Sequence, residues 1–168
     1  NQNQCHYCEP GQFNPIKGQT VCQFCGAGKY SIDKGASVCT DCDAGKYSTT
    51  DGASSDVFCI NCGAGKYSPI TNGANNGVCQ NCDAGKYSTA LGAVDASDCT
   101  DCGAGKYSNI DGATAASDCK DCDAGKYSEI DVAVSENVCK NCTEGKYSTT
   151  VAATASSYCQ KCDSGKYS

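Results

Sequence analysis

The apolar residues of this chain occur singly or in very short groups, and they return at a fixed period. The recurring phrase is Gly-Lys-Tyr-Ser, as at 45–48, and it predicts a short extended segment. The polar stretch that follows, such as Thr49–Ala53, predicts a turn, and a brief return to cysteine ends the unit. The pattern therefore predicts small irregular hairpins, with at most one helical turn at 95–98 or 113–118.

The period is set by nine Cys-x-x-Cys pairs. The first two intervals between pairs are 17 residues long and the next six are 20, so we divide the chain into two shorter repeats (5–38), six longer repeats (39–158) and the start of a further, incomplete repeat (159–168). The three extra residues enter between the Gly-Ala of a repeat and its next cysteine. Repeats of this size contact mainly their sequence neighbours, which predicts a linear array and an elongated rod.

Two glycine positions recur in the repeats. The glycine before the Lys-Tyr, as at Gly45, is kept in every repeat, and a positive φ or a close backbone approach would explain this. The later glycine, as at Gly52, gives way to Val132 and Ala152. Because a β-branched residue rarely adopts a positive φ, we expect that the later turn does not require glycine. We expect the recurring tyrosine to cover the disulfides and stack on the next repeat, with a ladder of sugar-binding rings as the alternative.

Composition explains why the cysteines are needed. The chain has 18 Cys and 19 Gly but no Met, no Trp and only 3 Phe, so it cannot bury a large apolar core. Disulfides must take the place of that core, which predicts an oxidising, extracellular, secreted or cell-surface location. The net charge of −6 and the absence of Arg argue against nucleic-acid binding. No apolar run is long enough to span a membrane.

Spacing alone does not fix the disulfide pairing. We prefer bridges from the second Cys of one pair to the first Cys of the next, because each then closes one hairpin and contributes about 3 kcal/mol. The alternative is zinc, since Cys39, Cys42, Cys59 and Cys62 have the spacing of a four-cysteine site, but zinc would use pairs two at a time and leave one of the nine unused. We expect no metal and no cofactor. The preferred bridges are Cys8–Cys22, Cys25–Cys39, Cys42–Cys59, Cys62–Cys79, Cys82–Cys99, Cys102–Cys119, Cys122–Cys139 and Cys142–Cys159.

This pairing leaves Cys5 and Cys162 over. Cys162 begins a repeat that has no closing cysteine before Ser168, so the simplest interpretation is that the natural chain continues. A sharper hypothesis joins Cys162 of one molecule to Cys5 of the next in a head-to-tail polymer.

The phrase Cys-x-x-Cys-x-x-Gly-Lys-Tyr-Ser-x-x-x-Gly-Ala-x-x-Cys, clearest at 22–39, resembles the ephrin-receptor-like cysteine-rich repeats. It is also similar to the first half-module of tumour necrosis factor receptor repeats, and to arrays in surface proteins of protists and metazoans. The resemblance implies an extracellular rod of disulfide-bonded hairpins and supports the Cys42–Cys59 style of pairing. The 20-residue intervals and the uniformity of the array depart from the tumour necrosis factor receptor pattern.

Two functional hypotheses follow. The first is a structural protein, a self-associating segment of a fibre, stalk or surface coat, because uniform repeats present one patch along a line. The second is a receptor or adhesin ectodomain that binds a protein or glycan, for which Tyr7, Phe24, Phe58 and Tyr158 stand outside the repeat rule. An enzyme is not expected, because the single His6 has no catalytic partner pattern.

One segment predicts a covalent modification. Asn141-Cys142-Thr143 is an acceptor sequence for an N-linked glycan, so the chain is a candidate glycoprotein. The central cysteine would lie near a disulfide, which would hinder the transferase.

Overall fold

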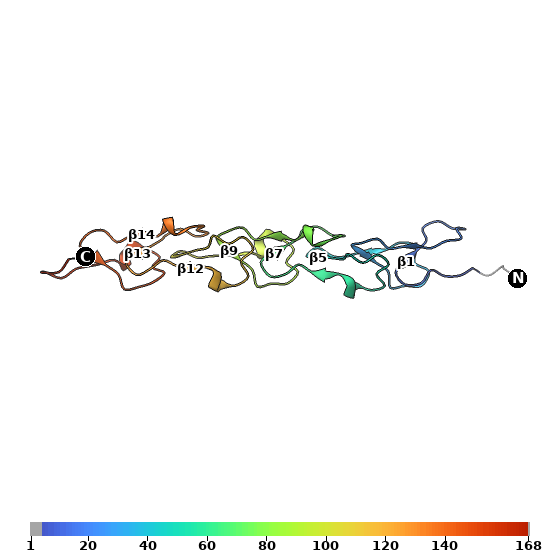
Figure 1. Ribbon diagram of the computed structural model, residues 1–168, viewed down its shortest axis with the longest axis horizontal. Coiled ribbons are helices and arrows are strands. Elements are labelled where there is room, and N and C mark those ends of the chain that lie inside the picture. The colour runs from blue at the N-terminus through green and yellow to red at the C-terminus, as the bar shows by residue number, and fades with distance from the viewer. Residues whose placement is uncertain (1–4, 168) are drawn as a thin grey trace. The chain divides into compact units, whose positions relative to one another are not determined.

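A computed structural model describes residues 5–167 of the chain. These residues form two compact units. The N-terminal unit contains the described residues of Asn1–Gln80 together with Ala90–Asp95, and the C-terminal unit contains Asn81–Thr89 and the described residues of Ala96–Ser168. In each unit, short strands alternate with loops, as the small arrows on the ribbon of Figure 1 show.

Every strand is two residues long, because each contains only the Lys-Tyr of a repeat, its counterpart Gln12–Phe13 in the first repeat, or the two residues inside a Cys-x-x-Cys pair. The strands associate as antiparallel pairs, β1 with β2, β3 with β4 and β5 with β6 in the N-terminal unit, and β9 with β10, β11 with β12, β13 with β14 and β15 with β16 in the C-terminal unit. The bounds are β1 (Gln12–Phe13), β2 (Gln23–Phe24), β3 (Lys29–Tyr30), β4 (Thr40–Asp41), β5 (Lys46–Tyr47), β6 (Ile60–Asn61), β7 (Lys66–Tyr67), β8 (Gln80–Asn81), β9 (Lys86–Tyr87), β10 (Thr100–Asp101), β11 (Lys106–Tyr107), β12 (Lys120–Asp121), β13 (Lys126–Tyr127), β14 (Lys140–Asn141), β15 (Lys146–Tyr147) and β16 (Gln160–Lys161).

The three residues that distinguish a 20-residue repeat form one turn of 3-10 helix. This turn ends directly before the cysteine that closes the hairpin, and its first carbonyl accepts the N–H of that cysteine, as Asp56 does from Cys59 at 2.9 Å. The single helical turns expected at 95–98 and 113–118 are confirmed. The six turns are η1 (Asp56–Phe58), η2 (Asn76–Val78), η3 (Ala96–Asp98), η4 (Ala116–Asp118), η5 (Glu136–Val138) and η6 (Ser156–Tyr158).

Each hairpin repeat, meaning the segment between two bonded cysteines, begins with a tight turn that we call the early turn. In the third repeat it runs over Asp43–Lys46, and the Lys46 N–H donates to the Asp43 carbonyl at 3.2 Å. Gly45 is the third of the four turn residues and has φ +79°. A four-residue turn with a positive φ at this position favours glycine, which adopts that φ without steric cost. The positive φ expected for the recurring glycine is therefore confirmed.

The later turn of each repeat, which we call the late turn, corrects one expectation from the sequence. Gly92 and Gly112 have φ of +71° and +72° there, but Val132 and Ala152 have φ of +56° and +53°. The turn does accept residues other than glycine, as expected, but the reason given for it is wrong, because the β-branched Val132 has a positive φ. The reason is tertiary: the Val132 N–H donates to the Cys102 carbonyl at 3.0 Å, so the position is held by the repeat before it.

Backbone hydrogen bonds join each hairpin repeat to the next. In the N-terminal unit, the Gly45 N–H donates to the Ser68 carbonyl at 2.8 Å, and the Ser48 N–H donates to the Gly73 carbonyl at 2.9 Å. In the opposite direction, the Asn72 N–H donates to the Cys42 carbonyl at 2.8 Å. The same three bonds recur in the C-terminal unit, so the repeats of each unit are joined through the backbone and not through large side chains.

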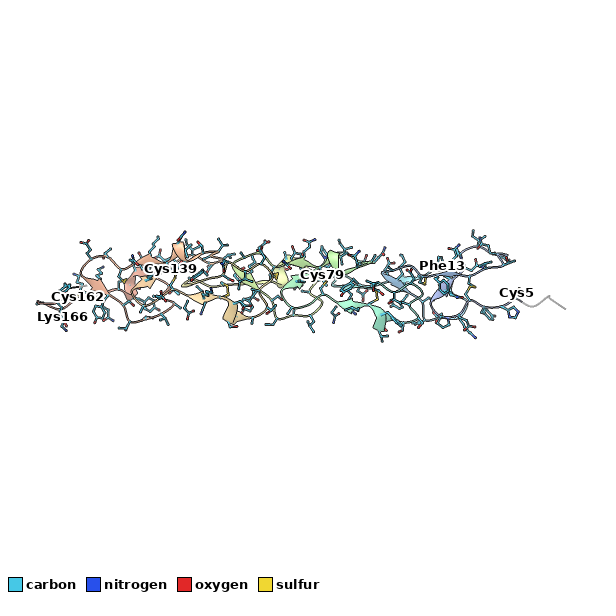
Figure 2. The ribbon with its side chains drawn as sticks, viewed as in Figure 1. Cys5, Phe13, Cys79, Cys139, Cys162 and Lys166 are labelled. Atoms are coloured by element: carbon cyan, nitrogen blue, oxygen red, sulfur yellow. A yellow bond between two sulfur atoms is a disulfide. The ribbon has the colours of Figure 1, made fainter. Side chains whose placement is uncertain are left out.

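The interior of both units consists of small residues. The fully buried side chains are cysteines and serines, and alanines of the late turns, such as Ala113 and Ala153, are nearly as buried. The buried Ser48 hydroxyl accepts a hydrogen bond from the Thr50 N–H at 3.3 Å, and among residues 5–167 no buried side-chain polar atom lacks a partner. In Figure 2 most side chains project outward from the ribbon, as expected where cross-links replace an apolar core.

Candidate functional site

The eight disulfides form the chemical framework of the repeats. Their Cα–Cα distances are 5.6–5.8 Å, and each closes one hairpin repeat between the second cysteine of one pair and the first of the next. The fold class, a disulfide-rich tandem array of short hairpins, is therefore confirmed. The bonded pairs are Cys8–Cys22, Cys25–Cys39, Cys42–Cys59, Cys62–Cys79, Cys82–Cys99, Cys102–Cys119, Cys122–Cys139 and Cys142–Cys159.

The cysteines of the zinc alternative are not brought together as one ligand set. Cys39 is bonded to Cys25, Cys42 to Cys59, and Cys62 belongs to a third bridge. Within residues 5–167 no group of three or more His, Cys, Asp or Glu side chains has the arrangement of a metal site. Disulfide sulfur is a poor metal ligand compared with a thiolate, so the framework and a zinc site exclude each other at these positions.

Two cysteines are outside the framework. Cys5 is exposed in the N-terminal unit and Cys162 is half-buried in the C-terminal unit, and both are free. Figure 2 labels Cys5 as the first described residue of the chain and shows Cys162 close to Lys166. A shallow hollow of about 460 Å³ next to Cys162 is lined by Tyr147, Asp163, Lys166 and Tyr167. The head-to-tail bond between these cysteines stays a hypothesis.

In several repeats, including the third and the sixth, the early turn is also covered by the late turn two repeats further along. A Cβ added at Gly45 would lie 2.2 Å from the Gly92 carbonyl oxygen, and one added at Gly105 would lie 2.3 Å from the Ala152 carbonyl oxygen. Such distances leave room only for glycine. The close backbone approach considered from the sequence is therefore confirmed, in addition to the positive φ.

Aspartates at the late turn cap the early turn of the preceding repeat, a role that sequence reasoning missed. Asp51 Oδ1 accepts the Ala27 N–H at 2.9 Å, Asp111 Oδ1 accepts the Ala84 N–H at 3.0 Å, and Asp131 Oδ1 accepts the Ala104 N–H at 2.8 Å. The available signal was the recurrence of Asp directly before the late-turn residue.

Charged side chains pair across several hairpins. Lys29 pairs with Asp41 and Lys106 with Asp121, while Lys86 Nζ lies 2.6 Å from Asp101 Oδ1. These pairs are largely exposed, so each contributes at most about 1 kcal/mol and is weakened by salt. The pairs occur where the second residue between the cysteines of a Cys-x-x-Cys pair is Asp, because this residue lies opposite the Lys of the other strand in the antiparallel pair.

Lys126 makes a different contact. The residue opposite it is Asn141, and its ammonium instead donates to Glu136 Oε1 at 2.6 Å. This hydrogen bond raises the pKa of Lys126 above its ordinary value of 10.5 and lowers the pKa of Glu136 below 4.5. Both groups are exposed, so the pair adjusts local charge and does not create a reactive acid or base.

Several large apolar side chains of the N-terminal unit are exposed. Phe24 is 66% exposed, its ring lies against the late-turn Gly52, and it lines a hollow of about 360 Å³ with Phe13 and Val38. Val57, Phe58 and Ile60 are exposed around η1 and β6, with Val57 78% exposed. Tyr7 is exposed beside Gly35, and Tyr158 is 44% exposed in the C-terminal unit.

The recurring tyrosines join neighbouring repeats through their backbones. Tyr47 bridges to Gly73, and Tyr87 bridges to Ala113, in the parallel sense. The rings from Tyr30 to Tyr127 are half-buried, whereas Tyr147 and Tyr167 are exposed. A continuous row of fully exposed rings, as a sugar-binding ladder would need, does not occur along residues 30–127.

A comparison with known protein families gives a match to part of the chain. Residues 71–119 match the family described as tyrosine-protein kinase ephrin type A/B receptor-like. The matched segment covers part of the fourth repeat and all of the fifth and sixth. No curated protein matches the chain.

The family match and the disulfides together indicate an extracellular or cell-surface, disulfide-rich repeat. Disulfide-rich repeats of this family are typically not enzymes. No helix within residues 5–167 has the length and hydropathy that crossing a bilayer requires.

Proposed function

We propose that this chain is a segment of an extracellular structural protein, a fibre, stalk or surface coat whose repeats associate with copies of the same chain. The observation that carries the proposal is the repetition itself. The same backbone bonds, as from Gly45 to Ser68 and from Gly105 to Ser128, place each hairpin repeat in the same way on its neighbour. A surface that repeats at a fixed interval suits a partner with the same interval, and a second copy of the chain has it.

The proposal assigns no catalysis to the chain. His6, the only histidine, is exposed near the free Cys5, and the one pair with shifted pKa values, Lys126 and Glu136, is solvent-exposed. A catalytic acid or nucleophile needs a partner that activates it within a sheltered pocket. The repeats supply backbone contacts and surface, which are the requirements of a structural role.

Electron microscopy and sedimentation velocity of the secreted, disulfide-bonded protein test the proposal. We expect filaments or lateral arrays with an axial repeat, and a weight-average sedimentation coefficient that rises with concentration. Monodisperse single molecules over the whole concentration range would contradict self-association.

A second candidate function, a receptor or adhesin ectodomain, is favoured by one specific observation. Phe24 has no apolar counterpart in the later repeats, where polar residues such as Asp101 stand at its place. Val57 and Ile60, on either side of Phe58, are likewise replaced there by residues such as Ser117 and Lys120. Exposed aromatic residues of this kind are common at binding hot spots. Under this alternative the N-terminal unit binds a protein or glycan.

Substitution separates the two functions. The double change Phe24→Ser and Phe58→Ser should leave filament formation unchanged if these rings serve a foreign ligand, and should abolish it if they are contacts between copies. Tyr158→Ser is the matched control, since this ring is also exposed but lies in the C-terminal unit. Tyr158→Ser should have no effect on assembly in either case.

A further inference from the structure

We propose that Asn141 carries an N-linked glycan. The transfer forms a bond between Asn141 Nδ2 and C1 of the first sugar, and it breaks the bond from that C1 to the pyrophosphate of a lipid-linked oligosaccharide. One amide proton is lost and the lipid pyrophosphate leaves, so the step needs no oxidant or reductant. The proposal depends on passage through the secretory route, and not on whether the chain assembles with itself.

The position of Asn141 in its hairpin makes it accessible. Asn141 is the second residue of β14, and both residues of that strand are exposed. The equivalent Asn61 is also exposed, even though its carboxamide oxygen lies against the late-turn Gly92 of a later repeat. A late turn packed against this position therefore does not by itself bury the side chain.

The carboxamide of Asn141 is not needed by the fold. Where the strand carries Asp, as at Asp101 and Asp121, the carboxylate accepts a hydrogen bond from the Lys opposite. Opposite Asn141 the ammonium of Lys126 is held by Glu136, and the Asn141 carboxamide has no hydrogen-bond partner within residues 5–167. Attaching a sugar to Nδ2 therefore breaks no side-chain contact of the folded protein.

The order of synthesis explains why the disulfide of Cys142 does not hinder the glycan transferase at Asn141. Cys142 is bonded to Cys159, which follows it by 17 residues. Because the chain enters the secretory compartment from its N-terminus, residues 141–143 arrive while Cys159 is still absent and Cys142 is still a thiol. The acceptor is then an extended segment, and the disulfide closes afterwards on a hairpin whose exposed face already carries the glycan.

The chain offers a matched position for the test. Asn61-Cys62-Gly63 has the same place in the fourth repeat but lacks the hydroxyl residue of the acceptor. Gly63 has no positive φ, and a Cβ added there would meet nothing within 4 Å, so Gly63→Thr completes the acceptor without strain. Thr143→Ala removes the acceptor at Asn141 and leaves the asparagine in place.

The experiment expresses the full chain in a secreting eukaryotic cell and treats it with peptide N-glycosidase in heavy-oxygen water. We expect one glycan on the unsubstituted protein, with the heavy oxygen at residue 141, its loss in Thr143→Ala, and a second glycan in Gly63→Thr. A glycan in Gly63→Thr but none at Asn141 would overturn the proposal, and so would a glycan at Asn141 that appears only when Cys159→Ser prevents closure of the disulfide. Absence of glycans from all variants of the secreted protein would overturn it as well.

Discussion

Val132 occupies a backbone region that β-branched residues rarely adopt. Its φ is +56°, whereas the equivalent glycines Gly92 and Gly112 have φ near +70°. The position is fixed from both sides: the Val132 N–H donates to Cys102, and its carbonyl group lies over the early-turn Gly85. Because these backbone contacts hold the turn in the left-handed region, the side chain must tolerate a conformation that costs about 1–2 kcal/mol.

Val132→Gly should therefore stabilise the C-terminal unit, by about 1 kcal/mol after the greater backbone entropy of the unfolded glycine is subtracted. The measurement is hydrogen exchange of the Ser108 amide, which donates to Ala133 directly after the turn. Its exchange should slow about fivefold. Val134→Gly is the control, since Val134 does not have a positive φ, and it should speed exchange. Equal destabilisation by both substitutions would contradict the strain at Val132.

The Lys126–Glu136 pair gives a pH-dependent prediction at the same scale. The pKa of Glu136 is lowered below 4.5 in the folded protein, mainly by the hydrogen bond from Lys126. The ionised Glu136 carboxylate therefore stabilises the fold above about pH 4.5, and this stabilisation is lost as the pH falls through the lowered pKa. The raised pKa of Lys126 gives a contribution that is present below 10.5 and is lost as the pH rises through the raised value.

Titration of the Glu136 carboxyl carbon by NMR tests the pair. We expect a midpoint below 4.5 in the natural sequence, and a return towards 4.5 in Lys126→Gln, which removes the ammonium donor. Lys120→Gln serves as the control, because Lys120 lies in another hairpin and is not among the causes of the Glu136 shift. An unchanged midpoint in Lys126→Gln would show that the two side chains are not paired in solution.

At the scale of elements, each hairpin repeat is too small to bury a core, and it is completed by the backbone of its neighbours. The early turn of the third repeat donates the Gly45 N–H to Ser68 in the next repeat and is covered by the Gly92 carbonyl from the one after. Two-residue strands alone would be marginal in water. The interlocking turns supply the hydrogen bonds that such short strands lack.

Gly45→Ala should destabilise this contact strongly. The substitution combines φ +79° with an approach of 2.2 Å to the Gly92 carbonyl oxygen, so we expect a loss of at least about 2 kcal/mol. Gly63→Ala is the control, because an added Cβ there meets nothing within 4 Å. The measurement is hydrogen exchange of the Cys62 amide, whose N–H donates to the Gly45 carbonyl. This exchange should be faster in Gly45→Ala than in Gly63→Ala. Similar exchange in both variants would contradict the close approach.

At the scale of the whole molecule, sulfur bridges take the place of an apolar interior. The buried apolar residues of the described chain are cysteines and alanines, while larger residues such as Val57 and Phe24 are exposed. Each of the eight bridges restricts the unfolded chain and contributes about 3 kcal/mol to stability. Without the bridges the chain has no other large stabilising term.

Reduction and alkylation of all cysteines should therefore unfold both units. We expect amide protection to disappear throughout residues 5–167, including the Cys25 amide in the N-terminal unit and the Cys122 amide in the C-terminal unit. Alkylated protein that keeps these amides protected would refute the dependence on disulfides. A parallel sample that is reduced but not alkylated should also stay unfolded when zinc is added. Refolding that depends on zinc would support a four-cysteine zinc site instead of disulfides.

The sequence by itself determined the repeat, its hairpin character and the dependence on cysteine, because these follow from local spacing and from the lack of large apolar residues. The early-turn glycine at Gly45 was also predictable, since its recurrence points to a backbone need. Tertiary structure alone decided three features: the left-handed turn at Val132, the hydrogen bond from the Ala27 N–H to Asp51, and the hydrogen bond from Lys126 to Glu136 within one hairpin. Each joins residues from different hairpins or different parts of a hairpin. The conformational preference of a residue depends on its chain neighbours, whereas these backbone and charge contacts form only when the chain has folded.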